Sequence, residues 1–147
     1  MITTVLTRAI GGLLLAPILM VALALLVKGY VDVGDGFTAG LVAALGVLLQ
    51  YLAFGRAAVE RALPVRHAPR VAAAGLLIAL GVTLVPALAG GAPLQHEPAP
   101  GAEVTTVGSI ELITAVLFDV GVFGLVLGVC VAAIGFLAAD APEEDAP

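Results

Sequence analysis

The stretch LITAVLFDVGVFGLVLGVCVAAIGFLAA, residues 112–139, decides the fold class of this chain. A helix needs about 20 apolar residues to cross the hydrocarbon core of a bilayer, and this stretch is long enough to do so. Apart from the thiol of Cys130, its only ionisable side chain is Asp119. A carboxylate at that depth costs roughly 2.5–3.5 kcal/mol on insertion scales, which makes it a candidate functional residue. The stretch therefore predicts a membrane helix with one conspicuous polar position.

Three further apolar stretches are long enough to span, so we predict an all-α, polytopic membrane protein with four transmembrane helices. The predicted spans are residues 10–27, 36–54, 71–90 and 110–138. The composition agrees with this class, because 61% of the 147 residues are hydrophobic and only 12% are charged. The apolar run after Arg8 exceeds the roughly 7–15 residues of a signal-peptide core, so we expect a retained helix.

The distribution of Lys and Arg predicts how the helices are oriented. The connection between the second and third spans carries four arginines, Arg56, Arg61, Arg66 and Arg70. Arg8 precedes the first span, and only Lys28 falls on the other side of the membrane. Basic residues in short loops stay cytoplasmic, so both termini are predicted to be cytoplasmic. Residues 1–140 would then form a single four-helix membrane domain, followed by an acidic cytoplasmic tail at residues 141–147.

Small residues recur at intervals of four in two of the predicted helices. One set is Gly36, Gly40 and Ala44, and the other is Gly124, Gly128 and Ala132. Apolar side chains gain little by leaving lipid tails for one another, so membrane helices pack where small residues let their backbones approach closely. These two sets predict packing faces.

The predicted fourth helix contains the polar residues on which an ion path could depend. Glu111 and Asp119 are eight residues apart, which is about 12 Å along a helix axis, and Thr114 lies between them. This spacing predicts a short polar ladder that descends from the external side. Asp119 either takes part in ion or proton traffic or hydrogen-bonds a neighbouring subunit or helix, and its position leaves both interpretations open.

The first connection and the start of the second span read Gly29-Tyr-Val-Asp-Val-Gly34-Asp35-Gly36-Phe37-Thr-Ala-Gly40. Glycines permit backbone conformations that other residues disfavour, and Asp35 at a helix start complements the positive end of the helix dipole. A tight, capped turn that enters a helix explains the same residues. No Gly-Lys-Ser or Gly-Lys-Thr follows, so the segment is not a phosphate-binding loop.

Enzymatic function has little support in this sequence. We find no Ser-His-Asp pattern, Cys pair or dinucleotide fingerprint, so we expect a chain that is not an enzyme and has no cofactor. His67 and His96 lie in connections predicted to be on opposite sides of the membrane, so no metal site within the chain is expected. The formal net charge is -5, but four of the eleven acids lie in the last eight residues, so its sign says little about the body of the chain. Nucleic acid is not an expected partner.

Two motifs together resemble a known family. In that family the first connection typically reads Gly-His, a few residues, Pro-Gly-Gly-Gly-Phe and a further Gly, and this chain matches it at Gly29, Gly34, Gly36, Phe37 and Gly40. Its Phe118-Asp119-Val120-Gly121-Val122 is similar to the family's Phe-Asp-Leu-Gly-Val. With four spans and this length, the chain resembles the B subunit of the Mrp-type multisubunit Na+/H+ antiporters, the MnhB family. It departs from the pattern at Tyr30 for His, Val33 for Pro and Asp35 for Gly.

The resemblance implies a function that composition and spacing do not. Family membership implies a multi-pass subunit of a hetero-oligomeric complex in the cytoplasmic membrane that exchanges cytoplasmic Na+ for external H+. The implied partners are the other antiporter subunits, including large subunits similar to those of respiratory complex I, together with membrane lipids. By this resemblance, Asp119 and Phe37 are candidates for the ion path. Asp35, Glu111 and Thr114 are further candidates, which come from their polar side chains and positions and not from the resemblance. The scaffold of the two motifs is formed by Phe118 and five glycines, Gly29, Gly34, Gly36, Gly40 and Gly121.

Two alternatives remain at this point. Closely related sequences occur in membrane-bound hydrogenases and related respiratory complexes, so the chain could be the homologous membrane subunit of one of these. It could also be a non-conducting scaffold that packs large subunits together.

Overall fold

The computed structural model describes residues 5–28, 35–88, 90, 106–107, 110–111 and 114–140. Within these residues, four helices are long and apolar enough to cross a membrane. They are α1 (Val5–Lys28), α2 (Gly36–Phe54), α4 (Ala68–Leu88) and α5 (Thr114–Asp140). The short helix α3 (Arg56–Ala62) and the 3-10 turn η1 (Val65–His67) lie between α2 and α4. The prediction of an all-helical protein with four candidate membrane spans is confirmed.

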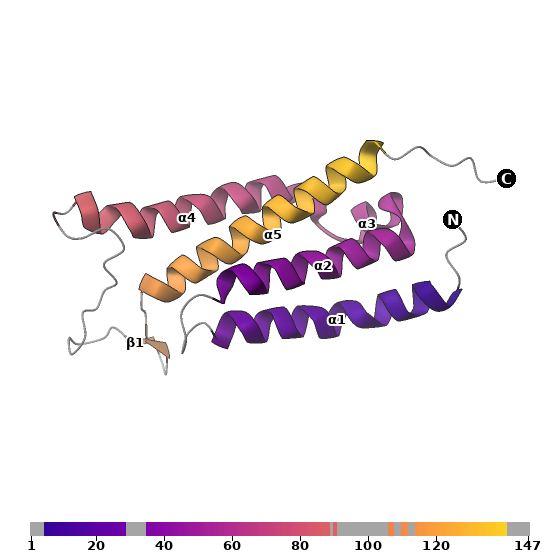
Figure 1. The fold of residues 1–147 in the computed structure, drawn as a ribbon, viewed down its shortest axis with the longest axis horizontal. Helices are drawn as coiled ribbons and strands as arrows, with labels where there is room; N and C mark the ends of the chain where they lie inside the picture. Colours follow the sequence, from indigo (N-terminus) through magenta and orange to yellow (C-terminus); the bar gives the residue numbers. More distant parts are fainter. Residues whose placement is uncertain are drawn as a thin grey trace.

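The central helices of the bundle are α2 and α5 (Figure 1). Helix α5 packs against both α2 and α4, α1 packs almost entirely on α2, and the described parts of α1 and α4 do not touch each other. In the most apolar part of each helix, 50% of the residues of α2 are buried inside the chain, against 11% in α1 and 11% in the segment Val65–Leu88, which includes α4. The outer faces of α1 and α4 therefore remain for lipid or for other proteins.

Small residues set how closely the central helices approach. A Cβ added at Gly40 on α2 would lie 2.9 Å from the carbonyl oxygen of Phe123 on α5. On the other side of α5, one added at Gly75 on α4 would lie 2.5 Å from the carbonyl oxygen of Gly121. Gly128 lies equally close to the backbone of Ala72. The predicted packing faces are thus present, with Gly36 and Gly40 turned toward α5 and Gly128 toward α4.

The charged connection after α2 is itself ordered. Gly55, with φ of 80° and ψ of 166°, breaks the helix between Phe54 and Arg56. This backbone conformation favours glycine, because a side chain would crowd the backbone at positive φ. Its N–H still donates to the carbonyl of Tyr51 at 3.0 Å. The chain turns from α2 into α3 and returns through η1 into α4.

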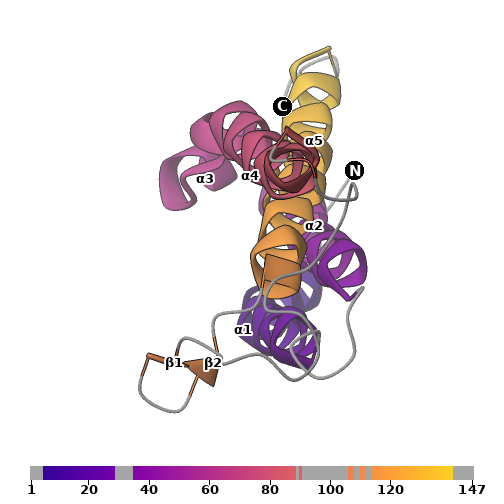
Figure 2. The same ribbon diagram turned by 90° about the vertical axis from the view of Figure 1, so that its left-hand side faces the viewer.

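The fourth span begins later than its apolar pattern predicts. We expected helix from residue 110, but α5 begins at Thr114. Ile110–Glu111 instead forms strand β2, which pairs antiparallel with β1 (Thr106–Val107) in the register Thr106–Glu111 and Val107–Ile110. The intervening sequence is Gly108-Ser109, a pair typical of short hairpin connections. Figure 2 shows the hairpin to one side of the helices, near the end where α5 begins.

A buried hydrogen bond joins the first two helices. Gln50 on α2 is 6% exposed, and its Nε2 donates to the carbonyl oxygen of Gly11 on α1 at 2.8 Å. Gly11 is also the point of closest packing, since a Cβ there would lie 2.7 Å from the Cβ of Ala53. In an apolar surrounding, a polar side chain is stable only when its hydrogen bonds are made, so this pair fixes the register of α1 on α2.

We predict that Gly75→Ala destabilises the α4–α5 contact by about 1–3 kcal/mol, because its Cβ would meet the α5 backbone, which has no flexible end to move aside. Gly81→Ala on the same helix is the matched control, since nothing lies within 4 Å of a Cβ there. Unfolding of the purified chain by SDS titration in detergent measures the difference. Equal stability of the two variants would contradict the contact.

Candidate functional site

The two sequence motifs meet in space. Gly36, the first residue of α2, lies against the backbone of Asp119 on α5: a Cβ at Gly36 would be 3.0 Å from the carbonyl carbon and closer still to the carbonyl oxygen. Only glycine leaves room for this approach. The glycine motif and the Phe118-Asp119 motif therefore form one local structure at the interface of the two central helices.

Asp119 is buried in this interface, with 3% of its surface exposed. It is the sixth residue of α5, so it lies about 7.5 Å along the axis from the helix start. Gly36, the first residue of α2, packs against the backbone of Asp119. The acidic residue is thus enclosed where the start of α2 packs against α5.

Asp35 occupies the residue before α2 and is paired with Lys28 at the end of α1. The Nζ of Lys28 is 2.8 Å from Oδ2 of Asp35, and the side chains are 59% and 23% exposed. Asp35 stands at the N-cap position, yet its side chain makes no cap hydrogen bond. Its carboxylate therefore joins the ends of α1 and α2 across the first connection instead of capping α2.

The remaining predicted residues differ in their surroundings. Phe37 follows Gly36 but is 57% exposed, so its ring lies at the surface of the chain. Phe118 and Thr114 are half-buried on α5. Gly121 is buried against the backbone of α4, since a Cβ added at Gly121 would lie 2.9 Å from the backbone nitrogen of Ala79. Gly29 and Gly34 lie outside the described residues.

The predicted polar ladder on one helix is wrong. Glu111 lies in β2, before α5 begins, so it is not on the same helix as Asp119 and the axial spacing of about 12 Å does not apply. An apolar count extends a span through Ile110 and Leu112, but it does not detect strand pairing. Asp119 is accordingly nearer the start of its helix than we expected.

Sequence reasoning missed two polar contacts near these helices. The contact of Gln50 could have been expected, because Gln50 is the sole amide side chain in the second apolar stretch and needs a hydrogen-bond partner there. The contact between Lys28 and Asp35 could also have been expected, because they are opposite charges at the two ends of a short connection. Among the described residues, no three His, Cys, Asp or Glu side chains are grouped as a metal site would require.

The fold and the joined motifs define a class: a small polytopic membrane protein whose central helices are locked by glycines beside a buried aspartate. Residues 6–132 match the family described as a domain related to the MnhB subunit of Na+/H+ antiporter. The chain belongs to this MnhB family, and the resemblance inferred from the two motifs is confirmed.

Known relatives agree with this assignment. The B subunit of the Na(+)/H(+) antiporter of Alkalihalophilus pseudofirmus is 32% identical over 135 residues, which cover 92% of this chain and 90% of that protein. The corresponding B subunit of the Na(+)/H(+) antiporter of Bacillus subtilis is 35% identical over 112 residues, 76% of this chain and 77% of that protein. The chain is therefore a multi-pass protein of the cell membrane.

Two further similarities involve much longer chains. A probable A/B subunit of a K(+)/H(+) antiporter of Rhizobium meliloti is 39% identical over 112 residues, and the match spans 76% of this chain but only 11% of that protein. The solved Mrp complex from Dietzia sp. DQ12-45-1b matches with a TM-score of 0.71 and 31% identity, over 97% of this chain and 15% of that chain. This chain thus corresponds to a small part of each.

We predict opposite results for two neighbouring substitutions at the start of α2. Gly36→Ala should lower the thermal unfolding midpoint of the purified chain, because its Cβ would overlap the Asp119 carbonyl and separate α2 from α5. Phe37→Ala should leave that midpoint within about 2 °C, because the exposed ring contributes little to packing within the chain. A stable Gly36→Ala variant would show that the helices do not approach this closely.

Proposed function

We propose that this chain is the B-type subunit of an Mrp-type cation/proton antiporter that exchanges cytoplasmic Na+ for external H+. The observation that carries the proposal is the contact between Gly36 and Asp119, because it joins the two family motifs into one structure. Family membership and the likeness to a solved Mrp complex support the same assignment. The partners are the other antiporter subunits, including the large subunits similar to those of respiratory complex I.

Asp119 is the residue we propose for the cation or proton path. Its burial at 3% exposure, within a span otherwise made of apolar or small residues, is costly and is typical of membrane carboxylates that face an interior or a cavity. We also propose Asp35, Thr114 and Glu111 as contributors to this path, together with residues of the partner subunits.

Assembly is the second part of the proposed role. The outward faces of α1 and α4 expose large apolar side chains, such as Leu13 at 75% and Leu77 at 69%. These faces suit lipid and the membrane helices of partner subunits. Phe37, exposed beside the joined motifs, is the residue we propose as a contact to a partner at the site itself.

We also propose that residues 1–140 form one four-helix membrane domain with both termini in the cytoplasm, and that residues 141–147 form an acidic cytoplasmic tail. The beginning of α1 and the end of α5 lie at the same end of the bundle as α3 (Figure 1). That end carries the four arginines of the second connection, and basic residues in short connections stay cytoplasmic.

Replacing Asp119 by Asn tests the ion-path proposal. In the assembled complex, reconstituted in vesicles with a pH-sensitive dye, we expect Asp119→Asn to lower the rate of Na+-driven proton exchange at least about tenfold. Glu143→Gln is the matched carboxyl-to-amide control, because Glu143 lies in the acidic tail, outside both sequence motifs. Assays with K+ in place of Na+ define the cation. Full exchange with Asp119→Asn would instead favour a non-conducting scaffold.

The proposed orientation predicts which connections a membrane-impermeant maleimide reaches in intact cells. In a Cys130→Ala background, a cysteine at Gln95 should be labelled from outside, and one at Arg61 should be labelled only after permeabilisation. Labelling of Arg61→Cys in intact cells would reverse the topology.

A further inference from the structure

A cleft of about 470 Å³ opens at the end of the bundle where α2 ends and α4 begins, and residues of α5 form its opposite wall. Its polar side carries Tyr51, Arg56, Glu60 and Arg66. Its apolar side includes Val131 and Phe136 of α5. Because three membrane-spanning helices begin or end here, this cleft lies at a boundary between hydrocarbon and headgroup.

The charged residues that line the cleft are two arginines, Arg56 and Arg66, and one acid, Glu60. Arg56 Nε is 2.7 Å from Glu60 Oε1, and the two side chains are 45% and 42% exposed. Arg66 also lines the cleft and is exposed, with its Nε donating to Nε2 of His67 at 3.1 Å. Glu60 offsets Arg56, so the lining of the cleft keeps one arginine in excess, and this charge attracts an anion.

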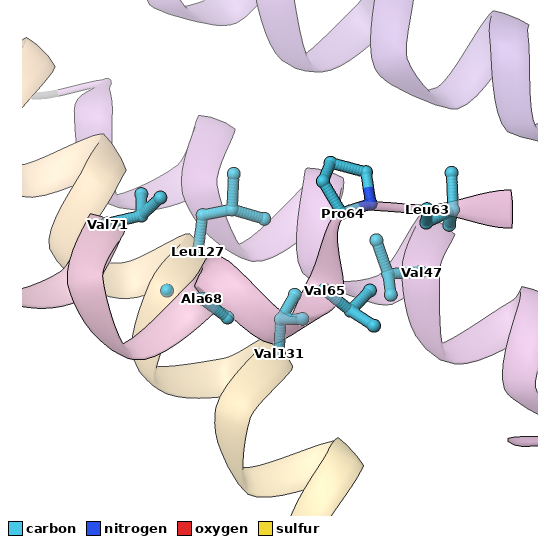
Figure 3. A pocket seen from close by; sticks show the side chains of 9 residues that line it. Val47, Leu63, Pro64, Val65, Ala68, Val71, Leu127 and Val131 are labelled. Atoms are coloured by element: carbon cyan, nitrogen blue, oxygen red, sulfur yellow. The ribbon is translucent and has the colours of Figure 1, made fainter. Parts of the chain in front are cut away.

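An apolar cavity adjoins this cleft. It has a volume of about 180 Å³ and lies between α2, the start of α4 and α5 (Figure 3). Val65 and Val131 line both spaces, so the polar cleft and the apolar cavity share a wall. Valine, leucine and proline side chains surround the cavity, as Figure 3 shows.

We propose that this cleft binds the phosphate of an anionic membrane lipid, with Arg56 and Arg66 as its basic partners and an acyl chain along Phe136 and the adjoining apolar cavity. Guanidinium groups bind phosphate through paired donors, and basic pockets between membrane helices suit anionic headgroups. The apolar wall favours a lipid over free phosphate, because an inorganic ion gains nothing from Val131 and Phe136. Arg56 and Arg66 therefore bind a lipid headgroup, in addition to favouring the cytoplasmic side of the membrane for this connection.

Photocrosslinking of the assembled complex tests the proposal. The probe is phosphatidylglycerol with a photoreactive acyl chain, and mass spectrometry of this chain's peptides is the readout. We expect labelling within residues 131–139, with competition by unlabelled phosphatidylglycerol and none by phosphatidylcholine or inorganic phosphate. This wild-type measurement does not depend on any variant folding. Competition by inorganic phosphate would make this a site for the free ion, and absence of labelling would overturn the proposal.

Paired substitutions separate the cleft from general surface charge. Arg56→Gln/Arg66→Gln removes both basic partners, and Arg61→Gln/Arg70→Gln removes the same charge from residues that do not line the cleft. Each lost arginine should weaken binding about fivefold, so the first pair should raise the apparent Kd about 25-fold. The control pair should change it less than about threefold. Equal losses of lipid affinity in the two pairs would show that general surface charge is responsible. Lipid that binds the isolated chain but not the complex would show that another protein of the complex fills the cleft. Either result overturns the proposal.

Discussion

The close approach of backbones at glycine is the constraint on which this fold depends. Inside a bilayer, apolar side chains are solvated by lipid, so helices associate mainly through dense packing and a few polar contacts. Helix α5 satisfies this requirement on two sides, with Gly36 and Gly40 of α2 on one and Gly75 of α4 on the other. Helix α1 uses the same solution at Gly11, reinforced by the hydrogen bond from Gln50. The buried position of Asp119 follows from this packing.

The positions of the four helices were largely predictable, because length and apolar content alone decide what can cross a membrane. Their neighbours were not. A helix that is apolar all round has no hydrophobic face that identifies its inner side, so only small residues hinted at contacts. Those hints were correct for Gly36, Gly40 and Gly128, but Gly75 belonged to neither set of small residues. The start of α5 was misjudged because the pairing of Ile110 with Val107 is a contact between segments, which an apolar window cannot detect.

At the candidate site, too, single elements were predictable from the sequence and the contact between them was not. Both motifs were visible in the sequence, and each contained a residue of interest, Gly36 in one and Asp119 in the other. Their contact was not visible, since it depends on how α2 and α5 cross. The exchange of the family's usual glycine for Asp35 has a structural counterpart in the ion pair with Lys28, which ties α1 to α2 at the end of the bundle that also holds Asp119. This variation adds charge beside the motif and leaves Gly36 in place.

The order of helices in space has a consequence for biogenesis. During synthesis α1 and α2 emerge together and can pair at once, but the second face of α2 has to wait for α5, which is made after α4. At roughly 5–20 residues per second, the ribosome needs about 4–17 s to proceed from Phe54 to Asp140. For that interval Gly36 and Gly40 face lipid, the translocon or an insertion factor. A mistimed α5 would leave the glycine face of α2 without the helix that covers it.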